Sequence, residues 1–480
     1  MAVPDADSSL NTSPHANMIR TLSPRVRGFA AGCALLSTII VPGPADAGQG
    51  DMAEHTLGNG MKIVVMEDHR APTIASMVWY RAGSMDEQSG TTGVAHVLEH
   101  MMFKGTKDHP GDTFSKTIAA AGGRENAFTN KDYTAYFQQL HKSRLPLAMT
   151  LEADRMHNLI LTDEEFAKEI KVVMEERRLR TDDQPRSLLF EQLLSAAYTA
   201  SPYRWPIIGW MTDLENMTAD DAREWYRRWY APNNAMLVVA GDVVPDEVFK
   251  MAEETFGRLD AQPLPARKQV VEPAQRGIKR LTVKAPGELP YLLMGWHVPV
   301  LRDVANDWEP YALEVLVGVL DGSDAARLDR SVVREQRLAV SAGASYDSVN
   351  RGPGMFYLDG SPAPGKTVAD LEGALRREVQ RVVDEGVSEA ELSRVKAQVI
   401  AQQVFQRDSI FYQAMQIGVL HTSGLPYDSN AIQVKRVREI TAEQVRAVAR
   451  RYFVDDALTI AVLEPQSLTK QAELDAAPKH

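Results

Sequence analysis

The sequence predicts an α+β fold in which two similar domains, each a sheet covered by helices, follow one another in tandem. Two observations predict this fold: a helix-then-strand pattern recurs at the end of each half, and a strand–loop–strand pattern recurs at the start of each. A chain of 480 residues that is 44% hydrophobic is long enough for two domains with sizeable cores. Its formal net charge of −11 argues against nucleic acid as a partner.

The first element, residues 1–47, has the pattern of a secretory signal peptide, which is removed from the mature protein. Arginines precede an apolar run, and Ala45-Asp46-Ala47 matches the small-residue signal at which such peptides are cleaved. The alternative, a membrane anchor, is disfavoured because the apolar run is too short to span a bilayer comfortably. Cleavage would also remove Cys33, the single cysteine, so any metal would be held by His, Asp or Glu. We therefore expect a protein of the bacterial periplasm with no membrane span after processing.

The mature chain then divides into a first domain at residues 51–260 and a second at residues 278–470. Each begins with a strand–loop–strand pattern, "MKIVVMEDHRAPTIASMVWYRAG" in the first and "RLTVKAPGELPYLLMGWHVPV" in the second. Each ends with a helix and a run of β-formers, and the helix starts at a capping threonine, Thr218 or Thr441, 223 positions apart. Residues 261–277 are rich in proline and lack periodicity, so we interpret them as a linker.

Within the first domain, the apolar segment "GVAHVLEHMMFKGT" contains His96, Glu99 and His100. On a helix, His96 and His100 project from one face one turn apart, which is the spacing that two ligands of one metal need. Glu99 shares that face but is offset, so it could contact a metal-bound water without coordinating the metal. The pattern H-x-x-E-H is the inverted form of a zinc peptidase motif. The alternative is a helix with two hydrogen-bonded histidines and a surface glutamate.

A third metal ligand is expected elsewhere, because catalytic zinc takes three protein ligands and leaves one position for water. The best candidate helix is "DEEFAKEIKVVMEERRLRTDDQP", whose apolar residues keep helical spacing. Glu169 and Glu176 are seven positions apart, two helical turns, and so lie on one face. The alternative is an ordinary charged helix exposed to solvent.

Three segments, "HVLEHMMFKGT", "GGRENAFTNKDYTAYF" and "EIKVVMEERR", resemble the pitrilysin-type zinc metallopeptidases, the M16 family, and most closely the short two-domain group that includes mitochondrial processing peptidase. In that family HxxEH is followed at a set distance by a liganding glutamate, with a second glutamate seven positions before it. Here 75 residues separate His100 from Glu176, and Glu169 stands at the second place. The resemblance covers essentially the whole mature chain and implies that the two domains form half of a clamshell chamber.

The resemblance implies a role for each motif residue. His96, His100 and Glu176 would hold one Zn²⁺ per chain. Glu99 would be the general base, and Glu169 would orient a ligand histidine or support the acid–base chemistry. The donor set fits this chemistry, since two neutral imidazoles and one carboxylate leave zinc a net positive charge that acidifies bound water to a pKa of about 7. Glu99 could then remove the water proton and return it to the leaving amine.

The segment after the Gly-Gly turn, "ENAFTNKDYTAYF", is rich in β-formers and reads as one strand. In the family the matching segment is an edge strand to which extended peptide substrates add, with Asn126 and Ala127 near the scissile bond. Without the resemblance, an ordinary interior strand is the alternative. Phe128, together with Phe103, could line a hydrophobic pocket for the substrate or pack in the core.

The second domain lacks a counterpart of the metal motif, because its matching segment, "PYALEVLVGVLDGSDAARL", contains no histidine. The isolated His297 and His421 are expected to be structural. The chain also departs from the family in "LDRSVVREQRLAVSAGASY". Complete enzymes have an arginine here, followed seven positions later by a tyrosine, and the pair binds substrate and stabilises the oxyanion. Here Arg334 is present, but the phrase is one residue shorter, so that Val340 stands where the tyrosine would be, and Tyr346 has the wrong spacing.

Together these features predict a zinc-dependent endopeptidase that hydrolyses extended peptides inside a chamber. Pitrilysin-like enzymes close a chamber from four such domains, so we expect this two-domain chain to need a second chain. The missing tyrosine favours a heterodimer, with a related zinc-free subunit that supplies the Arg–Tyr pair, over a homodimer. The alternatives are a non-catalytic structural subunit of the same fold and a homodimeric processing peptidase specific for one precursor.

Overall fold

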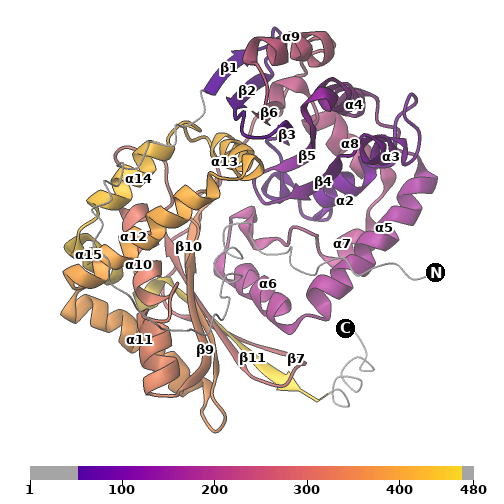
Figure 1. Ribbon diagram of the computed structural model, residues 1–480. Helices are drawn as coiled ribbons and strands as arrows, with labels where there is room; N and C mark the ends of the chain where they lie inside the picture. The colour runs from indigo at the N-terminus through magenta and orange to yellow at the C-terminus, as the bar shows by residue number, and fades with distance from the viewer. Residues whose placement is uncertain (1–51, 468–480) are drawn as a thin grey trace, which may run out of the picture.

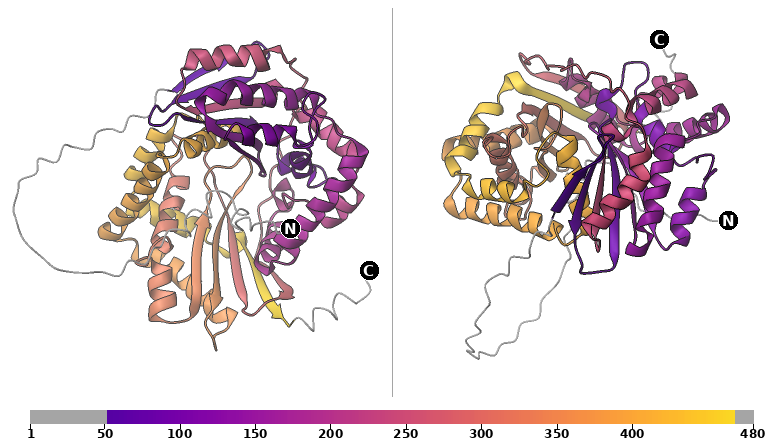
Figure 2. Two further views of the ribbon diagram at one scale, coloured as in Figure 1. Left: turned by 45° about the vertical axis from the view of Figure 1, so that its right-hand side comes forward. Right: turned by 90° about the horizontal axis from the view of Figure 1, so that it is seen from above.

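A computed structural model describes residues 52–467, and the expected signal peptide lies outside this range. Two sheets with their helices form two halves of similar architecture, so the α+β class is confirmed (Figure 1). The two halves remain distinguishable in further views as an indigo-to-magenta part and an orange-to-yellow part (Figure 2). Among residues 52–467, none of the helices combines the length and apolarity that crossing a membrane requires.

The first half is built on a six-stranded sheet with the order β1-β2-β6-β3-β5-β4. Its strands are β1 (Met52–Thr56), β2 (Lys62–Glu67), β3 (Thr73–Tyr80), β4 (Arg124–Thr129), β5 (Thr134–His141) and β6 (Ala235–Gly241). Only β2 and β6 pair in parallel; the other neighbours are antiparallel. The strand β4 therefore lies at one edge of the sheet, as expected from the resemblance.

One sequence prediction in this sheet is wrong in detail. The segment read as a single strand is a hairpin of β4 and β5, closed by a hydrogen bond from the Asn130 N–H to the Tyr133 carbonyl at 2.8 Å. The Asn130 side chain also accepts a bond from the Lys131 N–H at 2.6 Å. Asparagine favours such turns because its short side chain can bond the adjacent backbone, and this ends β4 after Thr129.

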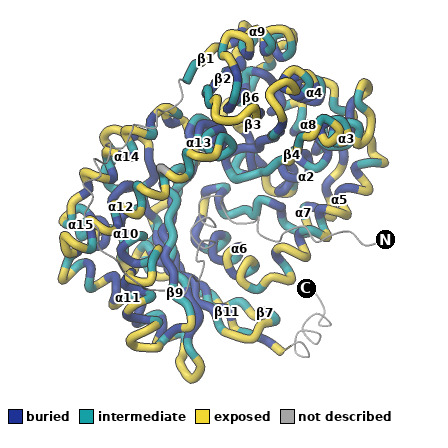
Figure 3. The backbone as a smooth tube through the Cα atoms, in the orientation of Figure 1, coloured by how far each residue is buried: buried dark blue, intermediate teal, exposed yellow. Residues whose placement is uncertain are grey.

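The helices of the first half pack their apolar sides on one face of this sheet. They are α2 (Val94–Met101), α3 (Thr113–Ala120), α4 (Leu145–Asn158), α5 (Asp163–Arg177), α7 (Met211–Asn216), α8 (Ala219–Trp229) and α9 (Pro245–Thr255). Successive strand residues alternate between the two faces, so Ile63 and Val65 face these helices while Val64 and Met66 face the other side. The inner strands β2, β3, β5 and β6 are therefore mostly buried, whereas the edge strands β1 and β4 are partly exposed (Figure 3).

The second half has a five-stranded sheet with the order β7-β11-β8-β10-β9. Its strands are β7 (Lys279–Pro286), β8 (Tyr291–Val298), β9 (Ala339–Tyr346), β10 (Gly354–Pro362) and β11 (Leu458–Gln466). Its helices are α10 (Glu309–Leu320), α11 (Val368–Glu385), α12 (Glu389–Gln406), α14 (Asn430–Glu439) and α15 (Ala442–Tyr452). The repeated pattern is confirmed: Thr218 and Thr441 both cap a helix with a capping box, and that helix leads to β6 in one half and β11 in the other.

Each half also covers the free face of the other half's sheet with one helix, an exchange that the sequence pattern did not reveal. The helix α13 (Ile410–Thr422) packs on β3 and β6, and α6 (Pro185–Ala197) packs on β7, β8 and β11. The contact of α13 is close: a methyl group in place of the Gly418 hydrogen would lie 1.9 Å from the Trp79 indole. Reciprocal helices of this kind fix the two halves against each other.

Residues 261–277 connect the halves, and no helix or strand is assigned there. Side chains bind this segment to the first half along its length. The Asn233 amide donates to the Gln262 carbonyl at 2.7 Å, and the Glu272 carboxylate accepts backbone N–H groups from residues 199–201 at 2.6–3.0 Å. Hydrogen bonds at Gln262 and Glu272 therefore hold the connecting segment against the first half.

Candidate metal centre

The helix α2 begins at Gly93, whose φ of +89° is a conformation that side chains rarely adopt. A side chain there would also meet the Ile208 carbonyl at 2.5 Å. The apolar residues of α2 are buried in the core of the first half, mainly against α5, α8 and β4. This packing presents His96, Glu99 and His100 toward α5 and the edge strand.

The helix α5 begins at Thr162, whose hydroxyl accepts the Glu165 N–H, and acidic residues in its first turn suit the positive helix end. Its apolar side packs in the core, and this orientation carries Glu169 and Glu176 toward α2. The predicted two-turn spacing thus places both carboxylates on the same histidine: Glu169 lies at one nitrogen of His100 and Glu176 at the other.

Three predicted ligands converge at the crossing of α2 and α5. One ligand atom from each of His96, His100 and Glu176 lies within 4.8 Å of the others. The Glu176 Oε2 atom is 3.1 Å from His100 Nε2 and 3.6 Å from His96 Nε2, and the two imidazole rings are 4.8 Å apart. Sequence separation between the two helices is large, so this convergence is a property of the fold.

The donor atoms fit a divalent cation. The Glu176 Oε2 atom is buried without a hydrogen-bond donor although it faces two imidazole nitrogens. Burial, followed by the positive charge of His100, lowers the pKa of His96 to about 3, so this ring is neutral as a metal ligand must be. Although burial opposes ionisation of Glu176, its contacts with His100 and His96 lower its pKa to about 2. Two nitrogens and one carboxylate oxygen are a zinc donor set.

A set of charged residues orients these groups. Glu169 Oε1 lies 3.0 Å from His100 Nδ1, and Glu169 Oε2 is 2.5 Å from the Lys104 ammonium. Arg180 forms an ion pair with the other oxygen of Glu176. Burial acts against a charge on His100, but its contacts with Glu169 and Glu176 outweigh it and raise its pKa to about 9, so a metal bound at Nε2 would have to displace a proton from this ring. Contact through Nδ1 leaves Nε2 of His100 directed at Glu176, the arrangement typical of histidine ligands held by a carboxylate.

Glu99 lies beside the ligands and is tied to the edge strand. The hydroxyl of Thr129, the last residue of β4, donates a hydrogen bond of 2.5 Å to Glu99 Oε2. Burial is the main reason that the pKa of Glu99 is raised, to about 7. A carboxyl group with a pKa near neutrality can both accept and return a proton at physiological pH.

Three residues of this site were not predicted. Arg180 follows its partner Glu176 by four positions, so helical spacing was a usable signal for it. Lys104 lies beyond the end of α2 and pairs with Glu169 of another helix, so spacing gave no signal for that contact. Thr129 had no such signal, because its contact with Glu99 joins a strand to a helix 30 positions away.

The predicted substrate-binding residues lie on the edge strand β4. Ala127 packs on the side of the sheet that carries α2, and Phe128 packs on the opposite side against Trp79 and Phe137. Phe128 is therefore largely a core residue on the face away from the metal ligands. The Asn126 side chain accepts a hydrogen bond from the Ala127 N–H at 2.9 Å. The outer edge of β4 has no neighbouring strand in the described sheet.

The structure does not bring Arg334 to the metal ligands. It lies in a π-helical segment, η7 (Leu328–Glu335), where its guanidinium pairs with Asp329 at 2.8 Å. Val340 is half-exposed on the edge strand β9. The Tyr346 hydroxyl donates to the Pro299 carbonyl at 2.5 Å and so is fixed within the second half. Among the described residues, no contact joins these side chains to the three ligands.

Two family models match consecutive parts of the chain. "Insulinase (Peptidase family M16)" matches residues 62–209, which include every predicted ligand, and "Peptidase M16 inactive domain" matches residues 216–399. The chain belongs to the M16 family of peptidases. The division agrees with the geometry, since all three ligands come from the first match.

Relatives of this M16 protein align along most of its length. A Helicobacter pylori protein named "Zinc protease PqqE" is 29% identical over 420 residues, 85% of this chain and 92% of that protein. "Uncharacterized zinc protease YmxG" of Bacillus subtilis is 26% identical over 411 residues, 86% of this chain and 98% of that protein. A crystal structure of a protease from Helicobacter pylori has a TM-score of 0.81 at 28% identity, covering 87% of this chain and 100% of that one. The first half of the periplasmic protease PqqL from Escherichia coli shares the fold, with a TM-score of 0.74 at 20% identity over 90% of this chain and 97% of that one.

Proposed function

We propose that this M16 protein is a zinc-dependent endopeptidase that hydrolyses extended peptides. The observation that carries the proposal is the convergence of His96, His100 and Glu176 within 4.8 Å, with the buried Glu99 beside them. The names of the relatives, which are zinc proteases, support it. The proposed site holds one zinc ion per chain, as the single cluster of ligands in residues 52–467 suggests.

In this proposal, His96, His100 and Glu176 hold the metal, and Glu169 and Lys104 keep the ring of His100 in its orientation. Zinc held by such a donor set makes water more acidic and polarises a peptide carbonyl. Glu99 accepts the proton of the attacking water and then gives it to the leaving amine. The hydroxyl of Thr129 donates a hydrogen bond of 2.5 Å to the Glu99 carboxyl group. The general base is therefore oriented by a residue of the same strand that would bind the substrate.

The edge strand β4 is the proposed binding site for the peptide. Its free edge offers backbone N–H and C=O groups to an added strand, which recognises extended peptides with modest dependence on side chains. Because Thr129 ends β4 and contacts Glu99, a peptide paired with Asn126 and Ala127 would pass close to the general base. In this proposal Phe128, which packs inward, stabilises the strand and does not contact the peptide.

We further propose that the working enzyme is a heterodimer with a related zinc-free subunit, which supplies the Arg–Tyr pair and completes a closed chamber. Arg334 is paired with Asp329 and Tyr346 with Pro299, so neither is free to act at the metal. This chain matches only 49% of the full PqqL chain, so that protein carries a second half of similar length. A homodimer is the alternative. The pattern of residues 1–47 supports export to the periplasm.

The decisive experiment measures zinc content and peptide cleavage for the wild type and for Glu99→Gln. The variant is expected to retain zinc and lose cleavage by about 10²–10⁴-fold, the usual contribution of general acid–base catalysis. Unchanged cleavage would exclude Glu99 as the base. Zinc retention without cleavage in the wild type, alone and with the co-purified subunit, would instead support the alternative of a non-catalytic structural subunit. Cleavage that rises only when the partner is added supports the heterodimer, whereas full activity of the chain alone refutes it.

A further inference from the structure

The start of α2 lacks the usual side-chain cap. Its N-cap residue is Gly93, which has no side chain to bind the free N–H groups of the first turn. Those groups bond instead to Glu87, six positions upstream: Glu87 Oε2 accepts the Gly93 N–H at 2.8 Å, and Oε1 accepts the Ala95 N–H at 2.9 Å. Glu87 is 5% exposed.

This cap lies next to the metal ligands in the chain. The helix α2 has only eight residues, and His96 follows directly after Ala95, whose N–H Glu87 binds. A displacement of the first turn therefore moves His96 and, one turn later, Glu99 and His100. The roles proposed above for the metal ligands and for Glu99 do not involve Glu87.

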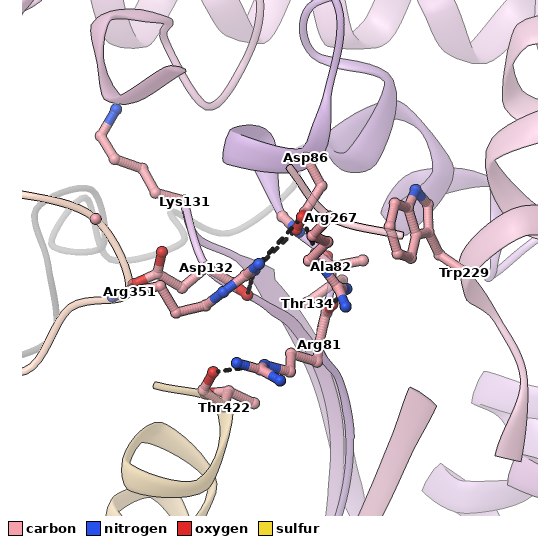
Figure 4. A network of polar contacts seen from close by, with 12 residues as sticks. Arg81, Ala82, Asp86, Lys131, Asp132, Thr134, Trp229, Arg267, Arg351 and Thr422 are labelled. Atoms are coloured by element: carbon pink, nitrogen blue, oxygen red, sulfur yellow. Dashed lines mark hydrogen bonds and ion pairs between the residues drawn. The ribbon is translucent and has the colours of Figure 1, made fainter. Parts of the chain in front are cut away.

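Asp86, the residue before Glu87, is held at the junction between the two halves (Figure 4). It accepts two bonds from the guanidinium of Arg351, at 2.8 and 3.1 Å. Arg351 belongs to the β9–β10 connection of the second half, and it is 7% exposed. Arg267 of the connecting segment donates a further bond to Asp86 at 2.9 Å. An arginine bound at two oxygens fixes both the distance and the orientation of the carboxylate.

The same arginine also fastens the hairpin that ends the edge strand. The guanidinium of Arg351 donates to the backbone carbonyl of Asp132 at 2.9 Å, and the backbone N–H of Arg351 donates to the Asp132 carboxylate at 3.0 Å. The turn preceding Glu87 lies against this hairpin, with the Ser84 N–H bonded to the Asn130 carbonyl at 3.1 Å. The second half therefore contacts Asp86, the neighbour of the residue that caps α2, and also the hairpin turn that follows β4.

We propose that Glu87 is a positioning residue of the metal centre, and that Arg351 of the second half positions it through Asp86. This inference rests on the proposed zinc site. It gives the metal-free half of the chain a direct part in the function of the other half, since seating of the second half would hold the metal helix in place.

The test compares Glu87→Gln with the matched control Glu314→Gln. Glu314 is a partly buried glutamate on α10 of the second half, and the Ser348 hydroxyl donates a hydrogen bond to it. Zinc affinity is measured by competition with a chelator, and the coordination geometry by the visible spectrum of the cobalt-substituted protein. Glu87→Gln is expected to weaken zinc binding about tenfold and to alter the cobalt spectrum. Glu314→Gln should stay within about twofold of the wild type. Equal affinities and identical spectra for Glu87→Gln and the wild type would overturn the proposal, as would an equal loss in both variants.

A second pair of variants tests the part played by the other half. Arg351→Met is compared with Arg327→Met, because Arg327 is a similarly buried arginine that pairs with Glu391 entirely inside the second half. Hydrogen exchange of the α2 amides in the metal-free protein should be faster in Arg351→Met and Glu87→Gln only. Unchanged exchange in both would refute the inference. Because this measurement needs neither zinc nor cleavage, it decides the role of Glu87 even if the wild type binds no zinc and the proposed function fails.

Discussion

The crossing of α2 with α5 and the crossing of α10 with α12 occupy equivalent places in the two halves. Each first helix packs on the helix that precedes β6 or β11, which is α8 or α15, and on an edge strand, β4 or β9. In the first half the crossing holds His96, His100 and Glu176. In the second it holds Gly318, where an added methyl group would lie 2.5 Å from Val395. One fold thus supports either a polar cluster or close apolar contact.

The difference shows that the metal site depends on the side chains at the crossing and not on the fold itself. Buried polar groups are costly without partners, so the first crossing needs Glu169, Lys104 and Arg180 around its ligands. The second crossing needs none of these, because its helices meet through aliphatic contact.

Replacing a ligand should separate metal binding from folding. His100→Ala removes one of three donors, and we expect zinc affinity to fall about a thousandfold, since metal ligands contribute several kcal/mol each. The matched change in the second half, Leu316→Ala, deletes a fully buried side chain of α10. It should lower the free energy of unfolding by about 3 kcal/mol and leave zinc affinity unchanged. Metal titration and urea unfolding check the pair, and normal zinc binding by His100→Ala would contradict the assignment.

Filling the second crossing should destabilise its half. In Gly318→Ala the new methyl group meets the branched side chain of Val395, which is buried and cannot swing aside. We expect the free energy of unfolding to fall by about 2 to 3 kcal/mol. The control is Gly373→Ala on α11, where the nearest atom is the flexible guanidinium of Arg377 at 3.1 Å. That change should stabilise the protein by about 0.5–1 kcal/mol. Urea denaturation measures both, and equal effects would mean that close approach does not matter at Gly318.

The carboxylate behind His100 should matter less than the ligand itself. Glu169→Gln weakens the bond to His100 Nδ1 and the pairing with Lys104, so zinc affinity is expected to drop about 10–100-fold. Glu165→Gln, on the same helix, changes an exposed glutamate that pairs only with Lys168 and should have no effect on the metal. Chelator competition compares the two. If Glu165→Gln proved as damaging, the loss would reflect the helix charge and not the contact with His100.

Much of the site could be predicted because its signals are local. Helical spacing placed His96 with His100 and Glu169 with Glu176 on shared faces, and the structure brings these faces together. The repeat at Thr218 and Thr441 likewise revealed the two halves. The contacts that escaped prediction join distant segments. The exchange of α6 and α13 brings together residues far apart in the chain, such as Trp79 and Gly418. The apolar face of each of these helices shows that it packs on a sheet but does not indicate which of the two sheets.

The role of Glu87 escaped prediction for a similar reason. A helix cap is normally sought at the residue that begins the helix, and here that residue is Gly93, so the local rule points to an uncapped end. The hairpin of β4 and β5 was missed although its turn signal at Asn130 was present in the sequence. Pairwise contacts across the junction of the halves, such as Arg351 with Asp86, have no periodicity that a sequence could display.

The smallest expected effect concerns a histidine of the second half that is partly buried and is not one of the proposed ligands. His421 lies on α13, the helix that covers the first sheet, and burial followed by the charges of Lys62 and Arg81 lowers its pKa to about 4. An unfolded chain has the ordinary value near 6.5, so between these values it binds more protons than the folded one. Stability is therefore unaffected by this group above pH 6.5 and falls as the pH decreases toward 4.

A neutral replacement isolates this contribution from all other titrating groups. Between pH 7 and pH 5 the wild type should lose up to about 2 kcal/mol more unfolding free energy than His421→Gln, as measured by urea denaturation at a series of pH values. His96 offers no such curve, because the proposed binding of zinc to that ring would add its own dependence on pH. Parallel stability curves for wild type and His421→Gln would show that α13 tolerates a charged imidazole against the first sheet. The contrast between ligand and structural histidines would then rest on geometry alone.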